Sequence, residues 1–473
     1  MRRTKIVCTI GPACDSEPIL RLLVREGMDV ARLNFSHASH EWAGRLVPLI
    51  RRIAAEEGRV VALLQDLQGP RLRTGALAAG EATLVSGSRF TLTTRDVIGD
   101  ASAVHIDFAN LPLDLKPGDR VLLDNGNLEL LVESTTPTDV ITLIIVGGVL
   151  GEHKGMNFPG VALDIPTLAD KDRADLRFGV QQGFDYVAMS FVRQADDLVL
   201  LKQLLYSAGS SAPVIAKIEK HEAVSNFEEI LAVADGIMVA RGDLGIETSV
   251  EEVPLLQKMI IASCRRAGKP VITATQMLES MMSSLRPTRA EASDIANAIL
   301  DGTDAVMLSG ETATGSYPVE AVRTMANVAA KAETAIPFDE HVDRARAEKA
   351  RSITDAIGQA TVEAAQELAA KAIIAATESG YTPRMIAKYR PSSPILAVTA
   401  VPAVLPRLAL IWGVVPTASP RYRHTDEMIE GSVREAQSRG FVSDGDVVVV
   451  VAGAPIGVPG RTNLLRILVV GEG

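Results

Sequence analysis

Short apolar runs alternate with longer amphipathic stretches along roughly the first 335 residues of the chain. Turn-forming residues bound each run, and most intervals between runs show helical periodicity. This alternation is typical of βα units that build a parallel sheet, and eight such units predict a closed (β/α)8 barrel. The eight runs read KIVCTIG, VARLNFS, VVALLQD, YVAMSFV, PVIAKIE, GIMVARGD, PVITATQ and AVMLSGE.

One interval departs from this pattern. Between the third and fourth runs, about 100 residues contain strand-like segments separated by glycine and proline, and no long helical pattern. A structureless loop of that length is improbable in a compact domain, so the interval predicts a small inserted β-barrel domain.

The alternation of apolar runs and helical stretches resumes after about residue 340, beyond a polar segment that contains proline. This predicts a separate C-terminal α/β domain. The expected fold class is therefore α/β: a (β/α)8 TIM barrel with a small β-barrel domain after its third strand and a C-terminal α/β domain. The expected boundaries are 1–70 and 167–337 for the barrel, 71–166 for the insert and 338–473 for the C-terminal domain.

Composition narrows the possible functions. The chain has 473 residues and a net charge of −10, which argues against a nucleic-acid partner because such proteins carry a basic surface. The most apolar stretch, 400–418, is interrupted by Arg407 and three prolines, so no membrane span is expected. The three cysteines form no C-x-x-C pair and fit no disulfide framework, which favours a cytoplasmic location.

Polar residues gather where the predicted barrel strands end. In (β/α)8 enzymes the catalytic groups project from the carboxyl ends of the strands, so these residues are expected at one rim. Burying so many polar groups without a purpose would cost free energy. They are Arg32, Asn34, Ser36, His37, Asp66, Ser190, Lys217, Glu219, Arg241, Gly242, Asp243, Thr273 and Thr275.

The chemistry of this set points to phosphoryl transfer. Glu219 and Asp243 lie on adjacent strands and could hold Mg²⁺ through their carboxylates, leaving positions for phosphate and water. A lysine beside such a metal, Lys217, is suited to stabilise charge on a transferring phosphoryl group, although a structural ion pair with Glu219 is the alternative. The remaining cations require an anionic substrate: Arg32, Arg241 and, in the insert, Arg73.

Long motifs then resemble those of the pyruvate kinase family over essentially the whole chain. The resemblance is more specific than any short motif because these segments are long and follow in the family's order. They are KIVCTIGPA at the start, RLNFSH at 32–37, GPRLRTG at 69–75, KGMNFPG at 154–160, KIEKHEAVSNFEEI at 217–230, DGIMVARGDLGIE at 235–247, ITATQMLESM at 272–281, the run from RPTRAEAS to PVEAV at 286–322, and ESGYTPR at 378–384.

The resemblance implies transfer of the phosphoryl group of phosphoenolpyruvate to ADP, giving pyruvate and ATP, with Mg²⁺ or Mn²⁺ bound. Residue by residue, it implies catalytic roles for Lys217, Arg32 and Thr275, and metal binding by Glu219 and Asp243. The implied substrate-binding residues are Arg32, Lys217, Gly242, Asp243 and Thr275, and the implied nucleotide-binding residues are Asn34, His37, Arg73 and Lys154.

The family's monovalent-cation site maps onto Asn34, Ser36, Asp66 and the carbonyl of Leu67. Here the chain departs from the usual pattern, since Arg71 stands where potassium-dependent members commonly carry glutamate. A guanidinium near Asp66 could supply the charge that K⁺ otherwise brings, so K⁺ is expected to be dispensable. Alternatively, Arg71 faces solvent and K⁺ binds as usual.

The resemblance also implies an allosteric activator and a homotetramer. The matching effector loop comprises Thr377, Ser379, Gly380, Tyr381 and Thr382, between a predicted strand and a helix, where hydroxyls and N–H groups can bind an anion. The loop has no lysine, which favours a sugar monophosphate over a bisphosphate. An ordinary strand-to-helix turn is the alternative.

Two other classes of protein stay open at this point. A metal-dependent barrel aldolase or lyase that acts on phosphoenolpyruvate or pyruvate would also use Glu219, Asp243 and Arg32, but would need no nucleotide-binding insert. A non-catalytic sensor on the same fold would be expected to have lost Lys217 or a metal carboxylate, and neither is lost.

Overall fold

Eight parallel strands close into a barrel at the centre of the computed structural model, which describes residues 1–161, 163–340, 343, 350, 352–457 and 460–472. The strand order around the barrel is β1-β16-β15-β14-β13-β12-β3-β2, and each strand corresponds to one of the eight apolar runs. The predicted barrel is therefore confirmed. Its strands are β1 (Lys5–Thr9), β2 (Val30–Asn34), β3 (Ala62–Asp66), β12 (Tyr186–Met189), β13 (Val214–Ile218), β14 (Gly236–Ala240), β15 (Val271–Ala274) and β16 (Ala305–Leu308).

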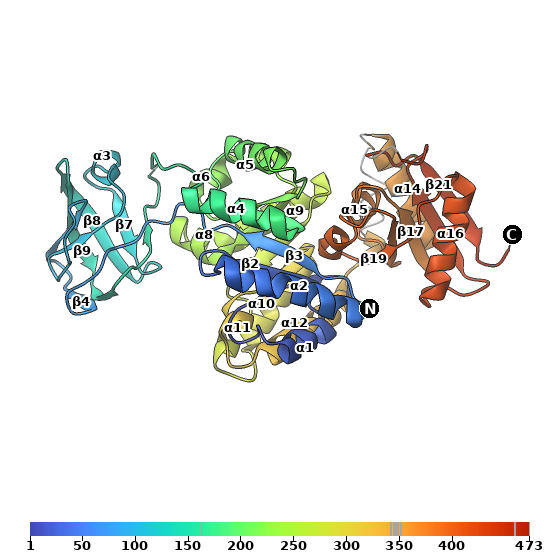
Figure 1. The fold of residues 1–473 in the computed structure, drawn as a ribbon, viewed down its shortest axis with the longest axis horizontal. Coiled ribbons are helices and arrows are strands. Elements are labelled where there is room, and N and C mark those ends of the chain that lie inside the picture. The colour runs from blue at the N-terminus through green and yellow to red at the C-terminus, as the bar shows by residue number, and fades with distance from the viewer. Residues whose placement is uncertain (162, 341–342, 344–349, 351, 458–459, 473) are drawn as a thin grey trace.

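Helices surround this barrel (Figure 1). Their ends follow the local sequence: α10 begins after Thr288, which forms a reciprocal capping box with Glu291, and ends at Gly302 with φ +99°. The helices are α1 (Glu17–Glu26), α2 (His40–Glu56), α4 (Asp170–Gln182), α5 (Ala195–Ser207), α6 (His221–Ser225), α7 (Phe227–Val233), α8 (Arg241–Glu247), α9 (Val253–Ala267), α10 (Arg289–Asp301), α11 (Gly310–Ala313) and α12 (Pro318–Ala332), with the 3₁₀ turns η1 (Glu279–Met282) and η2 (Glu333–Ala335).

The insert after β3 lies at one end of the molecule (Figure 1) and packs two sheets around one apolar core. Six strands pair in the order β11-β7-β8-β9-β5-β6, and β4 pairs with β10, so the pairing is that of two sheets rather than of one closed ring. The elements are β4 (Glu81–Leu84), β5 (Arg89–Thr93), β6 (Ala103–His105), α3 (Leu111–Asp114), β7 (Arg120–Leu123), β8 (Leu128–Thr135), β9 (Asp139–Val146), β10 (Gly148–Gly151) and β11 (Met156–Asn157).

The C-terminal part lies at the opposite end of the barrel and contains a five-stranded sheet in the order β19-β18-β17-β20-β21, with β21 antiparallel. This confirms the predicted α/β domain. The elements are α14 (Ile353–Glu367), β17 (Ala372–Ala376), α15 (Tyr381–Ala387), β18 (Ile395–Thr399), η3 (Pro406–Leu410), β19 (Val414–Ala418), α16 (Thr425–Ser438), β20 (Val447–Ala452) and β21 (Leu464–Val469). In the described parts of the chain, no helix has the length and apolar character needed to cross a bilayer.

The C-terminal part closes the end of the barrel that lies opposite the insert. Ala409 and Leu410 of η3 pack in the same cluster as barrel-interior residues such as Val7 and Leu64. Beside them, the guanidinium of Arg390 is buried, bonds Asp304 Oδ1 at 3.0 Å and lies over the ring of Trp412. The two parts are therefore joined by a packed interface that contains a buried ion pair.

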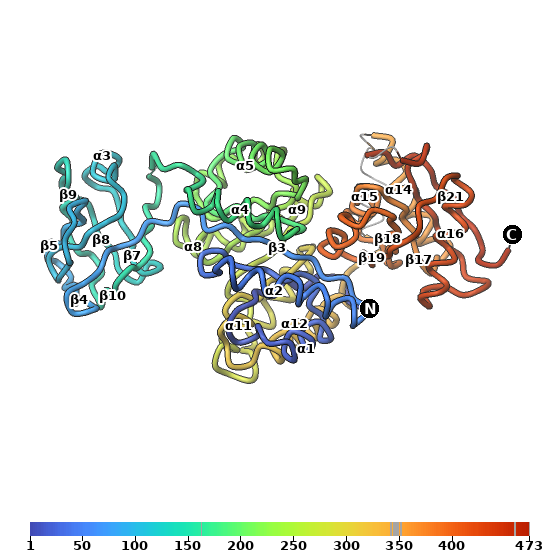
Figure 2. Tube along the Cα trace, viewed as in Figure 1, coloured from blue at the N-terminus to red at the C-terminus, as the bar shows by residue number. Residues whose placement is uncertain are grey.

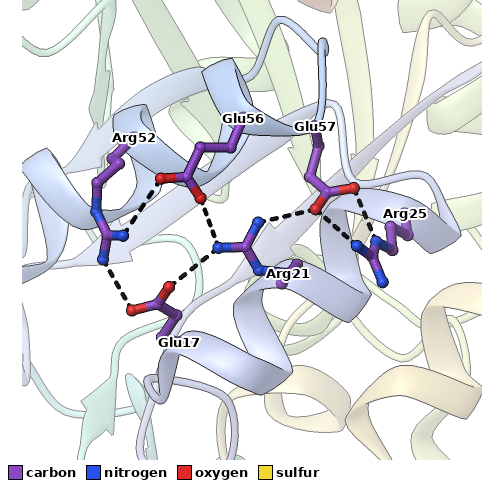
Figure 3. A network of polar contacts seen from close by, with 6 residues as sticks. All are labelled: Glu17, Arg21, Arg25, Arg52, Glu56 and Glu57. Carbon is purple, nitrogen blue, oxygen red and sulfur yellow. Dashed lines mark hydrogen bonds and ion pairs between the residues drawn. The ribbon is translucent and has the colours of Figure 1, made fainter.

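A second charged network lies on the surface, where arginines and glutamates of α1 and α2 alternate (Figure 3). Hydrogen bonds from Arg25 and Arg21 lower the pKa of Glu57 to about 2. Because this network lies at the surface, where salt screens charges, we expect the loss of one of its members to destabilise the protein less than the loss of one partner of the buried pair.

We expect Arg390→Met to destabilise the protein by about 3–5 kcal/mol, because it leaves the buried carboxylate of Asp304 without its charged partner. The matched control is Arg434→Met, which removes an exposed arginine that pairs with Glu430 and should cost less than about 0.5 kcal/mol. Urea unfolding of both variants makes the comparison, and equal midpoints would show that the buried pair does not stabilise the interface.

Candidate active site

The candidate site lies at the carboxyl ends of the barrel strands, on the side that faces the insert (Figure 1). Four charged residues from β2, β3 and β13 meet there. Arg32 lies in β2, Asp66 ends β3, and Lys217 and Glu219 lie in and directly after β13. All four are more than nine-tenths buried.

These four side chains form a chain of alternating charge. Arg32 Nε donates to Asp66 Oδ2 at 2.6 Å, and Lys217 Nζ lies 3.3 Å from Asp66 Oδ1 and 2.9 Å from Glu219 Oε1. Lys217 Nζ also donates to Ser190 Oγ at 2.6 Å. The ion pair of Lys217 with Glu219, named above as the alternative interpretation, is thus present, and it does not exclude a catalytic role.

The electrostatics of this chain favour the charged forms of Lys217 and Asp66. Burial alone would lower the pKa of Lys217, but the carboxylates of Asp66 and Glu219 hold that pKa above its usual value. Burial likewise opposes ionisation of Asp66, yet Lys217 and Arg32 keep its pKa below the usual value. A buried lysine is therefore charged and available to face an anion.

The two expected metal ligands lie close enough to influence each other. Burial and the neighbouring carboxylate of Asp243 raise the pKa of Glu219, while Lys217 and the N–H of Phe191 oppose the rise. Asp243 lies in the first turn of α8. Two carboxylates with no third His, Cys, Asp or Glu among the described residues fit a hard divalent cation that completes its shell with substrate and water oxygens.

The turn after β15 is strained. Thr275 has φ +69° and Gln276 has φ +54°, and a left-handed backbone is unfavourable for a β-branched residue. Thr275 Oγ1 accepts a hydrogen bond from Gly242 N at 2.8 Å. Arg241 braces the turn through Nη2, which donates to the Thr275 carbonyl at 2.7 Å, and pairs with Asp294 at 2.7 Å. Arg241 was expected to face an anionic substrate; instead its guanidinium is engaged with protein groups.

The segment after β2 is folded back on the barrel. Asn34 Oδ1 accepts from Ser36 N at 3.1 Å, and Phe35 N donates to the Asp66 carbonyl at 2.9 Å. Burial, Arg73, Arg71 and Arg32 lower the pKa of His37, which favours its neutral form. The Leu67 carbonyl accepts from Ser190 Oγ at 2.7 Å, so one oxygen of the expected monovalent-cation site already has a protein donor.

The expected pairing of Arg71 with Asp66 is not made. Asp66 is bonded to Arg32 and Lys217, whereas Arg71 Nη2 lies 3.5 Å from Asn125 Oδ1 in the insert and packs over Gly155. The cause is that the two barrel cations already neutralise Asp66. Arg71 instead acts electrostatically on His37.

The insert carries the two other expected nucleotide residues. The backbone of Arg73 forms an antiparallel β-bridge with that of Gly155, and Arg73 Nη1 lies 3.4 Å from the His153 carbonyl oxygen. Lys154 Nζ pairs with Asp124 Oδ1 at 2.8 Å within the insert. In this structure, the side chains of both residues contact groups of the insert.

The expected effector loop lines a cavity at the carboxyl ends of the C-terminal strands. Gly380 caps α15 with φ +81°, and its N–H donates to Thr377 Oγ1 at 2.9 Å. Ser379 and Tyr381 also line this cavity. Thr382, which was expected to contact an effector, is buried, and its hydroxyl lies 2.9 Å from Thr462 Oγ1. Little of its side chain is therefore accessible from the cavity.

Two further groups at the site were not expected from the sequence. Lys171 Nζ donates to the Phe35 carbonyl at 2.5 Å and pairs with Asp175 at 2.6 Å, which fixes the turn after β2. The buried carboxylate of Glu311 accepts from the N–H groups of Leu278 and Ser309. The i, i+4 spacing of Lys171 and Asp175 on a helix was the available signal, but it does not reveal the third partner.

Comparison with known proteins shows which family shares this arrangement. The family model "Pyruvate kinase, barrel domain" matches residues 1–322, and "Pyruvate kinase, alpha/beta domain" matches residues 355–468. The pyruvate kinase of Geobacillus stearothermophilus is 48% identical over 474 residues, which covers 100% of this chain and 81% of the relative. That of Clostridium acetobutylicum is 45% identical and covers 99% of this chain and 100% of the relative.

A solved structure shares the fold over the same length. The crystal structure of a pyruvate kinase from Cryptosporidium parvum superposes with a TM-score of 0.93 at 39% identity, covering 99% of this chain and 96% of that one. The function expected from the sequence is confirmed by these relatives, and none of them supports the barrel aldolase or lyase. The chain belongs to the pyruvate kinase family.

Proposed function

We propose the following roles for residues of this chain in the pyruvate kinase reaction, in which the phosphoryl group of phosphoenolpyruvate passes to ADP. The observation that carries the proposal is the buried chain Arg32–Asp66–Lys217–Glu219, which holds two cations at the barrel rim. Fixed charges in a site that excludes water stabilise a transferring phosphoryl group without reorganising during the reaction. Lys217 faces the transferring group and Arg32 holds the phosphate.

Glu219 and Asp243 hold Mg²⁺, or Mn²⁺ in its place. Such a cation would supply positive charge that offsets the negative charge of the phosphoryl group. The protein groups around it bind the remainder of phosphoenolpyruvate: the N–H of Gly242, Asp243 and the hydroxyl of Thr275 lie together at the ends of β14 and β15. Thr275, with its strained backbone held by Arg241, is placed to support protonation of the enolate through a water molecule.

The three parts of the chain have separate roles in this proposal. The barrel, residues 1–70 and 167–337, carries the chemistry. The insert, 71–166, is a lid that brings Arg73 and Lys154 to the nucleotide, beside Asn34 and His37 of the barrel, and excludes water when it closes. The C-terminal domain, 338–473, is regulatory.

We also propose that K⁺ is dispensable. Asn34, Ser36, Asp66 and Leu67 surround the expected cation position, and Asp66 is already compensated by two cations. Arg71 adds a permanent positive charge near His37, in the neighbouring segment. Arg71 supplies this charge from its position beside the insert, and not through an ion pair with Asp66.

For regulation, we propose that a sugar monophosphate binds the cavity lined by Thr377, Ser379 and Tyr381 and favours the form of a homotetramer that binds phosphoenolpyruvate better. Gly380 and Thr382 shape the loop from within. Glu378 lies 3.9 Å from Arg421, which reduces the repulsion that its charge would exert on a phosphate. The free, buried state of Cys8, Cys14 and Cys264 supports the proposed cytoplasmic location.

Lys217→Met should lower kcat on the order of 10³-fold while leaving the KM for ADP within about threefold, because the lost charge acts on the transition state. Steady-state assay of pyruvate formation measures both constants. Lys202→Met, which removes a half-buried lysine that pairs with Asp235 and donates to the Val233 carbonyl, is the control and should retain full turnover. Near-normal kcat in the Lys217 variant, with its fold verified by circular dichroism, would exclude the assigned role.

Wild-type protein should retain most of its activity when tetramethylammonium replaces K⁺, and Arg71→Glu should make activity depend on K⁺. The reason is that the substitution replaces a fixed positive charge by a negative one that a bound cation must balance. Arg89→Glu, an exposed charge reversal elsewhere on the lid, is the control and should leave the K⁺ response unchanged. Wild-type protein that is inactive without K⁺ would refute this proposal.

Ribose 5-phosphate or glucose 6-phosphate should shift the phosphoenolpyruvate saturation curve to lower concentration, and Ser379→Glu should abolish the shift. Ser379 is an exposed residue lining the cavity, so a carboxylate there repels phosphate without burying a charge. Ser438→Glu at the exposed end of α16 is the control. If neither sugar phosphate moves the wild-type curve, or if the Ser379 variant responds as wild type does, the effector does not bind in this loop.

A further inference from the structure

The neck of the lid is a two-stranded ribbon. Two chain segments join the insert to the barrel (Figure 2). Residues 69–74 lead into the insert, and residues 154–157 run antiparallel to them and end in β11, before the chain returns to the barrel. Thr74 N donates to the Lys154 carbonyl at 2.9 Å, Lys154 N donates to Thr74 Oγ1 at 2.9 Å, and Met156 N donates to the Leu72 carbonyl at 3.1 Å. Arg73 and Lys154, the proposed nucleotide residues of the lid, both lie on this ribbon.

Buried carboxylates of the barrel hold the base of both segments. On the outgoing side, Gly69 N donates to Asp172 Oδ1 at 3.0 Å, and Gly69 has φ +69°. On the returning side, Asn157 Nδ2 donates to Glu247 Oε1 at 2.7 Å. Asp172 and Glu247 are 1% and 4% exposed, and Asn157 is 9% exposed. Water therefore competes poorly for either anchor.

Glu247 also joins the two turns that carry the proposed metal ligands. Its Oε1 accepts from Lys220 Nζ at 2.6 Å, and Lys220 directly follows Glu219. Glu247 lies four residues after Asp243 on α8, so the two side chains share one side of that helix. A single buried carboxylate thus contacts the lid, the turn after β13 and the helix after β14.

We propose that Glu247 is a positioning residue for phosphoryl transfer: through Asn157 it sets the register of the lid neck, and through Lys220 it fixes the turn of Glu219 relative to Asp243. The inference rests on the proposed roles of Glu219, Asp243, Arg73 and Lys154. A buried ion pair contributes little net stability, because desolvation offsets the attraction, so a role in placement accounts better for this arrangement.

The consequence is a fixed distance between the metal and the nucleotide contacts. Because β11 pairs with β7, the bond from Asn157 to Glu247 ties the six-stranded sheet of the lid to the barrel. Without this attachment, Arg73 and Lys154 would approach the nucleotide phosphates over a range of positions. Misplacement of about 1 Å in a catalytic arrangement can cost up to about 100-fold in rate.

Asn157→Ala provides the first test. It removes the donor to Glu247 and leaves the Lys220 pair intact, so we expect the KM for ADP to rise about tenfold while kcat and the KM for phosphoenolpyruvate stay within about threefold. Asn110→Ala is the matched control, since Asn110 is an exposed lid asparagine without a side-chain capping bond. If Asn157 had a purely structural role, its loss would lower kcat or thermal stability without raising the KM for ADP selectively.

Glu247→Gln and Lys220→Met test the other contact. Glutamine can still accept from Asn157 but carries no charge for Lys220, so both variants should weaken Mn²⁺ binding to the substrate-free protein several-fold, measured by water-proton relaxation. The Asn157 variant should bind Mn²⁺ as wild type does. Unchanged Mn²⁺ binding in both variants would overturn the role of Glu247 toward the metal site.

Arg73→Met and Lys154→Met separate failure of this inference from failure of the proposed function. If both raise the KM for ADP but Asn157→Ala behaves like Asn110→Ala, the positioning role is overturned and the nucleotide assignment stands. If neither changes the KM for ADP, the nucleotide assignment itself is wrong, and the lid register has no role in nucleotide binding.

Discussion

Asp66 is the residue on which the candidate site depends. Its carboxylate is 1% exposed and lies between Arg32 and Lys217, so it holds two cations apart from each other at the rim of the barrel. Burying a charge costs several kcal/mol unless partners compensate, and here each charge compensates its neighbour. Loss of Asp66 would leave two buried cations facing each other, and Ser190 with the Leu67 carbonyl would lose the carboxylate beside them.

The fold was largely predictable because it follows from periodicity. The apolar runs that became β1 and β13 are buried on both sides, as parallel strands must be, and Gly302 marks the end of α10 by its left-handed backbone. Motif spacing then brought Lys217, Glu219 and Asp243 to adjacent strand ends. These features depend on a residue and its near neighbours in sequence.

The contacts that were not predicted join segments far apart in sequence. Arg241 pairs with Asp294, and Asn157 bonds Glu247, ninety residues later. A positive charge near a strand end can pair with either a substrate or a protein carboxylate. Arg241 pairs with a protein carboxylate because α10, which carries Asp294, packs against the barrel. For Arg71, the deciding fact is that Asp66 already had two partners.

The balance of charge in the proposed site favours binding of a cation beside Glu219 and Asp243. The cations of Arg32 and Lys217 are matched by Asp66 and Glu219, so Asp243 leaves one uncompensated negative charge. Burial, and in addition the charge of Asp243, raises the pKa of Glu219. A divalent cation held by Glu219 and Asp243, as proposed, would supply two positive charges and make the net charge of this group of residues positive. The proposed site would then attract an anionic substrate, while Asp66, Glu219 and Ser190 hold the ammonium group of Lys217 at the barrel rim.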